Sequence, residues 1–146
     1  MTLVVDASVA LKWFFADEPD SARALTIVRD EAVLAAPDLL VAEVCNAAWR
    51  LARLGRISRA QLDEIAAVLP RFFDPLVSAA GLAPRAVSIA AQLDHPVYDC
   101  LYLALAEMER AVLVTADTRL LGKVRSTAWE ARAVDLAQYG SGSLAG

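Results

Sequence analysis

Five short runs of apolar residues alternate along the chain with longer segments of helical periodicity. The runs cover residues 3–5, 32–36, 75–80, 112–115 and 131–134, and continuous apolar runs of this length are typical of strands buried on both faces. Between them, apolar spacing predicts helices over residues 7–15, 20–30, 38–54, 58–73, 84–93, 97–110 and 117–121. Strands that alternate with helices indicate a short, mostly parallel sheet, so we expect an α/β fold, a three-layer α/β/α sandwich.

Turn-forming and capping residues mark the ends of these elements. Ser58 and Gln61 have the spacing of a capping box at the start of a helix. Gly81 is expected to end the third strand, and Gly122 to end the helix that begins at 117. The pattern predicts a single domain over residues 1–138, followed by a disordered Gly/Ser-rich tail over residues 139–146.

Composition narrows the class of protein. Of the 146 residues, 58% are hydrophobic, which suggests an apolar face left for self-association or a partner. No apolar run is long enough for a membrane span and no export signal opens the chain, so we expect a cytoplasmic protein. Cys45 and Cys100 are expected to be reduced core thiols, since neither a disulfide framework nor a zinc-ligand spacing is present. The net charge of −4 argues against a general electrostatic nucleic-acid binder.

Four carboxylates lie at positions where a charged side chain is unexpected without a specific role. Two directly follow predicted strands, and two lie on predicted helices among apolar neighbours; they are Asp6, Asp117, Glu43 and Asp99. Ligands of parallel sheets bind outside the carboxyl ends of the strands, where Asp6 and Asp117 should meet. Carboxylates repel each other and resist burial, so a cluster of four is explained best by divalent cations.

Each acid also has an ordinary structural explanation. Asp6 and Asp117 could serve only as helix N-caps. Asp99 could interact with the helix dipole in a first turn, and Glu43 could reach solvent past its apolar neighbours.

Three polar residues near the acids could support a metal site. Ser8 could orient Asp6 or hold a water, and Thr115 places a hydroxyl at a strand end. Asn46, three residues after Glu43, could hydrogen-bond that carboxylate or face the same cavity. Oxygen ligands of this kind suit Mg²⁺ or Mn²⁺, which can promote in-line hydrolysis of a phosphodiester.

These motifs resemble those of PIN domains (PilT N-terminus), specifically VapC-type toxins. Four segments carry the resemblance in the family's order: residues 4–14 around Asp6, 37–46 around Glu43, 95–106 around Asp99, and 114–117 ending in Asp117. The resemblance spans nearly the whole chain and leaves out only the Gly/Ser tail.

The resemblance implies a Mg²⁺- or Mn²⁺-dependent endoribonuclease, the toxin of a type II toxin–antitoxin pair. It implies that the four acids form the metal site, with Ser8 and Thr115 as supporting residues, and that RNA is cut to leave a 5′-phosphate and a 3′-hydroxyl. It further implies a homodimer that a cognate antitoxin protein holds inactive.

Other readings of the chain stay open. A catalytically idle PIN-like scaffold that binds RNA or protein is the main alternative to a nuclease. Arginines at positions 50, 53, 56 and 59 could contact RNA phosphates, or could be solvated side chains near a helix end. We interpret His95, in a turn before Pro96, as structural and not as a general base.

Overall fold

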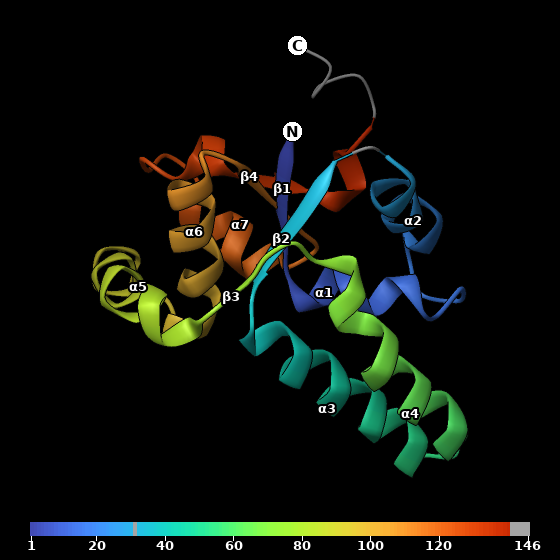
Figure 1. The fold of residues 1–146 in the computed structure, drawn as a ribbon. Coiled ribbons are helices and arrows are strands. Elements are labelled where there is room, and N and C mark those ends of the chain that lie inside the picture. Colours follow the sequence, from blue (N-terminus) through green and yellow to red (C-terminus); the bar gives the residue numbers. More distant parts are fainter. Residues whose placement is uncertain (31, 141–146) are drawn as a thin grey trace.

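A five-stranded parallel sheet forms the centre of the computed structural model, which describes residues 1–30 and 32–140 (Figure 1). The strands are β1 (Thr2–Val5), β2 (Val33–Pro37), β3 (Leu76–Val77), β4 (Val112–Thr115) and β5 (Ala133–Asp135). Their order is β3-β2-β1-β4-β5, and every pair is parallel. The central strand β1 therefore lies between β2 and β4, which are far apart in the sequence.

Helices cover both faces of this sheet. They are α1 (Ala7–Ala10), α2 (Ser21–Arg29), α3 (Leu39–Arg53), α4 (Arg59–Val68), α5 (Ala79–Leu93), α6 (Val97–Glu109) and α7 (Thr118–Val124), with 3₁₀ segments η1 (Leu11–Trp13), η2 (Leu69–Phe72), η3 (Glu130–Arg132) and η4 (Leu136–Gln138). In Figure 1, α5 and α6 lie on one side of the sheet and α2 on the other, while α3 and α4 project together from one end. The predicted three-layer α/β/α sandwich is confirmed. None of the described helices combines the length and apolar character needed to span a membrane.

Helix α6 packs at the centre of the hydrophobic core. Seven consecutive residues, 100–106, are buried, which means that this part of the helix has no solvent-facing side. Leu103 and Leu105 are fully buried, and burying each side chain contributes about 1.5–3 kcal/mol. The helix is therefore held rigidly against β1, β2 and β4, and the polar residues near its N-terminal end have fixed positions.

Helix boundaries near glycine and proline differ from the prediction because tertiary packing overrides the local preferences of these residues. Helix α5 begins at Ala79, although Gly81 and Pro84 suggested a later start. The buried residues that it presents to the core, Leu82 and Ala86 among them, favour helix from its first turn, and such packing overrides local propensity. Similarly, α7 continues through Gly122 to Val124, which is buried. The third strand is correspondingly short.

The first predicted helix, over residues 7–15, is divided into α1 and the 3₁₀ segment η1. Trp13 at the end of η1 is nearly buried, and its indole N–H donates to the Ala24 carbonyl at 3.0 Å. Its ring centroid lies 5.1 Å from that of Phe72 and 5.8 Å from that of Phe73. Trp13 thus joins η1 to α2 and to the segment after α4, as core packing predicts.

Tyr139, at the predicted start of the tail, packs against the domain. Its side chain is buried, its hydroxyl donates to the Asp30 carboxylate at 2.9 Å, and its carbonyl accepts from Arg23. The rest of the predicted tail, residues 141–146, lies outside the described residues. Both cysteines are free thiols; Cys100 belongs to the core as predicted, whereas Cys45 is only partly buried.

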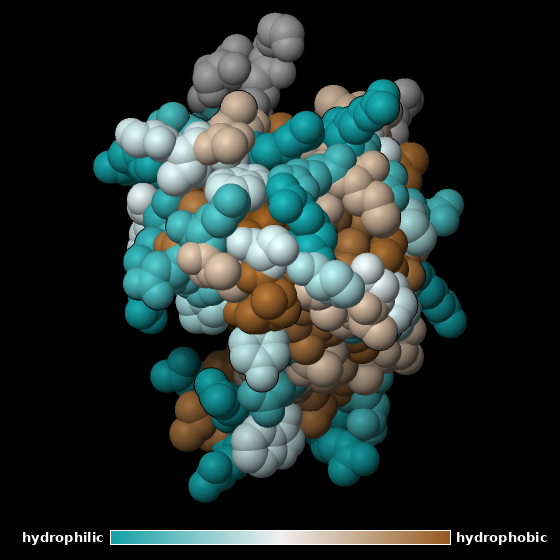
Figure 2. Space-filling model, turned by 90° about the vertical axis from the view of Figure 1, so that its left-hand side faces the viewer, coloured by the Kyte–Doolittle hydropathy of each residue, from teal (hydrophilic) through white to brown (hydrophobic). Residues whose placement is uncertain are grey.

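Apolar side chains also reach the surface. Figure 2 shows hydrophobic residues gathered across the middle of one face, above the projecting α3–α4 pair. Large exposed apolar side chains on the helices include Trp49, Leu54, Val87, Tyr98 and Met108. Exposed apolar area of this kind suits contact with another protein.

Candidate metal centre

The pairing of β1 with β4 brings two segments that are far apart in the sequence to one edge of the sheet. Val5, the last residue of β1, lies opposite Val114 on β4. Asp6 follows β1 directly, Thr115 ends β4, and Asp117 comes two residues later. The observed register therefore places Asp6 and Asp117 just beyond the carboxyl ends of neighbouring strands.

Asp6 is a buried carboxylate surrounded by hydrogen-bond donors. It is the N-cap of α1, and its Oδ1 accepts from the Val9 backbone N–H at 3.3 Å. Ser8 Oγ donates to the same oxygen at 2.5 Å, and the Thr115 hydroxyl donates to Oδ2. Burial disfavours the charged form and raises the pKa of Asp6 to about 6, although these hydrogen bonds lower it. Asp6 does cap the helix, but the hydrogen bonds do not fully compensate for the cost of burying its charge.

Ser8 and Thr115 connect the two strand ends. Thr115 is completely buried, and its Oγ1 also accepts from the Asp117 backbone N–H at 3.0 Å. Ser8 Oγ accepts from the Ala116 N–H at 3.0 Å. Each hydroxyl therefore binds Asp6 and the segment after β4 at once, which fixes the carboxylate relative to Asp117.

Glu43 enters the site from α3. Its Oε1 accepts a hydrogen bond of 2.6 Å from the hydroxyl of Tyr102 on α6. The pKa of Glu43 is raised, mainly by burial and further by the negative charge of Asp99, against the lowering effect of Tyr102. Glu43 is thus partly buried, bonded to Tyr102 on α6 and influenced by the charge of another carboxylate.

Asp99 lies in the first turn of α6, next to a histidine. Its Oδ2 is 2.6 Å from Nε2 of His95, and the His95 side chain is only 6% exposed. Ligand atoms of His95, Asp99 and Asp117 all lie within 4.8 Å of one another. Two of the predicted acids therefore approach closely enough to share one ion.

Asp117 is the N-cap of α7. Its Oδ1 accepts from the backbone N–H groups of Arg119 at 2.9 Å and Leu120 at 3.2 Å. Both bonds use the same oxygen, so the other carboxylate oxygen can still serve as a ligand. Capping and metal binding are compatible at this residue.

Electrostatic coupling links three of the acids. The charge of Asp99 raises the pKa of Asp6 and that of Glu43, while Asp117 joins the group through its proximity to Asp99. A set of carboxylate oxygens matches the preference of Mg²⁺ and Mn²⁺ for oxygen ligands. A divalent cation would offset this repulsion.

Two residues of the site were not predicted from the sequence. Tyr102 was read only as an apolar neighbour of Asp99, and His95 only as part of a turn. His95 lies in the turn before α6, so helical spacing alone does not predict its contact with Asp99. The predicted partner of Glu43, Asn46, is exposed, and among the described residues the hydrogen bond to Glu43 comes from Tyr102.

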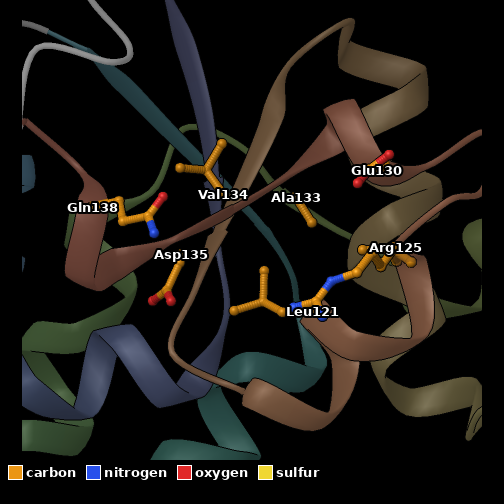
Figure 3. Close-up of a pocket in the computed structure, with 8 residues that line it drawn as sticks. Leu121, Arg125, Glu130, Ala133, Val134, Asp135 and Gln138 are labelled. Atoms are coloured by element: carbon orange, nitrogen blue, oxygen red, sulfur yellow. The ribbon is translucent and has the colours of Figure 1, made fainter.

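A separate pocket of about 350 Å³ lies beside the edge strand β5 (Figure 3). Leu121 and Arg125, in and just after α7, line it together with Ala133 and Val134 of β5. None of the four predicted acids is among its lining residues. Asp6 and Asp117 follow the carboxyl ends of β1 and β4, outside this pocket.

Comparison with known proteins agrees with these motifs. Residues 3–125 match the PIN domain family. Ribonuclease VapC3 from Pyrobaculum aerophilum is 34% identical over 125 residues, which cover 84% of this chain and 95% of the relative. The crystal structure of PAE2754 from Pyrobaculum aerophilum has a TM-score of 0.71 at 27% identity, covering 94% of this chain and 85% of that one. A toxin–antitoxin complex from Klebsiella pneumoniae has a TM-score of 0.67 at 18% identity, covering 92% and 97%. The chain therefore belongs to the PIN domain family, among its VapC-type members.

Proposed function

We propose that this protein is a metal-dependent endoribonuclease, the toxin of a type II toxin–antitoxin pair. In this proposal Asp6, Glu43, Asp99 and Asp117 hold Mg²⁺ or Mn²⁺ and RNA is the substrate. The observation that carries the proposal is a set of mutually repelling carboxylates, of which Asp6 is buried and the others are partly buried, with Asp99 raising the pKa of both Asp6 and Glu43. The 34% identity to a ribonuclease of the same family supports RNA as the substrate.

The residues of the site have separable tasks in phosphodiester hydrolysis. Bound divalent cations would supply Lewis acidity and neutralise charge on the phosphate. Asp99 and Asp117, which have ligand atoms within 4.8 Å of each other, would share an ion, while Asp6, just after β1, and Glu43 on α3 would complete its surroundings. Ser8 and Thr115 keep Asp6 in place by donating to opposite carboxylate oxygens. Rigid placement of this kind is what positions a phosphate for in-line attack.

We also propose that a cognate antitoxin binds this chain, as in the Klebsiella pneumoniae toxin–antitoxin complex of similar fold. A groove of about 350 Å³ between η1 and α4 offers a site for an apolar segment of such a partner. Trp13, Phe14 and Phe15 line one side of it, and Ile57 and Ile65 the other. The exposed apolar residues on the helices suit a homodimer. Measuring the molar mass in solution by light scattering would test this.

The alternative function, an idle scaffold, would use the same acids only as structural residues. The hydrogen bonds of Asp6 and Asp117 to helix N-termini are the observation in its favour. The two functions differ in one property. A scaffold gains no stability from Mn²⁺, because acids that serve only as structural residues do not bind the cation.

The experiment compares wild type, Asp99→Asn and Asp63→Asn in chelator and in Mn²⁺. At about 100 times its dissociation constant, Mn²⁺ should add about 2.7 kcal/mol to the unfolding free energy of wild type. Asp99→Asn should lose most of this gain and any RNA cleavage, yet be at least as stable in chelator, because its charge raises the pKa of Asp6 and Glu43. Asp63, exposed on α4 and paired with Arg59, is the control that removes an equal charge elsewhere.

The wild type decides between the two functions. A gain in Mn²⁺ together with metal-dependent cleavage of an RNA pool supports the nuclease. An unchanged wild type in Mn²⁺, with Asp99→Asn destabilised in chelator, would leave the scaffold as the function.

A further inference from the structure

Two hydrogen-bond donors of α6 and its preceding turn are directed at carboxylates of the site. His95 precedes Asp99 by four residues, and Tyr102 follows it by three. The His95 imidazole is 2.6 Å from the Asp99 carboxylate, and the Tyr102 hydroxyl is 2.6 Å from the Glu43 carboxylate. An ionised carboxylate can only accept, so in each pair the ring group donates.

Both donors are more deeply buried than the carboxylates that they contact. Tyr102 is 2% exposed within the fully packed part of α6. The side chain of His95 is 6% exposed, against 28% for Asp99. In each pair the ring is the more buried partner, so it can set the orientation of the acid.

This arrangement addresses a physical difficulty of the metal-free site. Like charges drive Asp99 and Glu43 apart, and free side chains would rotate away from each other before a cation arrives. A donor on one carboxylate oxygen holds the group in place and leaves the remaining lone pairs directed into the site. Hydrogen-bond partners of metal ligands commonly act in this way.

We propose that His95 and Tyr102 are positioning residues, which hold Asp99 and Glu43 in the metal-binding geometry before the metal binds. The inference rests on the proposed function, since it assigns these residues a role toward the same cations. Neither residue is a ligand: His95 acts through Asp99, and Tyr102 acts through Glu43.

The test measures Mn²⁺ affinity by the electron paramagnetic resonance signal of free Mn²⁺, independently of any RNA cleavage. Tyr102→Phe and His95→Phe keep a ring but lose the donor, and each should weaken binding by about 10- to 100-fold. His95→Gln restores an N–H donor near the position of Nε2 and should recover most of the affinity. Tyr98→Phe, on the same helix but 65% exposed, is the matched control and should bind Mn²⁺ as wild type does.

The outcomes separate this inference from the proposed function. If wild type binds Mn²⁺ and the two Phe variants, shown folded by their circular dichroism, bind equally well, the positioning role is wrong and the metal site stands. If wild type binds no Mn²⁺, both proposals fall. A nitrogen coupling to bound Mn²⁺ in pulsed resonance spectra of wild type, lost in His95→Gln, would make His95 a ligand and overturn its positioning role.

Discussion

Removing the buried charge of Asp6 should change how the stability of the metal-free protein depends on pH. Asp6→Asn keeps the size of the side chain and an acceptor oxygen for Ser8 or Thr115, but it cannot ionise. Burial raises the pKa of Asp6 from 3.8 to about 6. A carboxyl group with a raised folded-state pKa stabilises the fold at low pH, and this stabilisation is lost as the pH rises through the folded pKa.

The magnitude follows from the size of the shift. A change from 3.8 to about 6 corresponds to about 3 kcal/mol between the fully protonated and fully ionised limits. Of this, about 2 kcal/mol should be lost between about pH 4.5 and about pH 7.5. Relative to wild type, Asp6→Asn should therefore become more stable by about 2 kcal/mol over that interval.

Urea unfolding in chelator, followed by tryptophan fluorescence at several pH values, measures this difference. Subtracting the two curves largely cancels the titration of groups that the variant leaves unchanged. A difference that stays constant from about pH 4.5 to about pH 7.5 would refute the reasoning, because it would mean that Asp6 ionises in the fold as readily as in the unfolded chain.

Three further substitutions test contacts around the site and the fold. Thr115→Val removes the hydroxyl that bridges Asp6 and the Asp117 N–H, so we expect a loss of about 1–3 kcal/mol in urea unfolding. It should also raise the pKa of Asp6 further in a ¹³C NMR titration, because that hydrogen bond lowers it. Trp129→Phe removes the indole donor to Glu107 at 2.7 Å and should cost about 1 kcal/mol without altering Mn²⁺ affinity. Gly122→Ala should add about 0.5–1 kcal/mol, since the residue lies inside α7 with open space around a Cβ; a lower urea midpoint would contradict this.

The sheet was predictable because strands buried on both faces leave continuous apolar runs. Residues 3–5 and 112–115 show this most clearly, and both runs are strands in the structure. Helix starts near Gly81 were less predictable, because local propensity there opposes packing that only the folded chain supplies.

The site was predictable to the extent that topology controls it. Parallel pairing sends Asp6 and the end of β4 to one edge whatever the details of packing. The bond from Tyr102 to Glu43 joins residues 59 positions apart on different helices. Apolar periodicity indicates which side of each helix faces inward, but not which atoms meet across the gap, so this contact required the structure.

The place of β1 between β2 and β4 has a consequence for synthesis of the protein. Asp6 is synthesised 109 residues before Thr115, which donates to its second carboxylate oxygen. At about 5–20 residues per second, translation separates the two by roughly 5–20 seconds. Throughout that interval the growing chain carries Asp6 without the strand that brings it to Asp117. The acids can assemble only after β4 and Asp117 have been synthesised, so we expect products that end before β4 to lack the proposed nuclease activity.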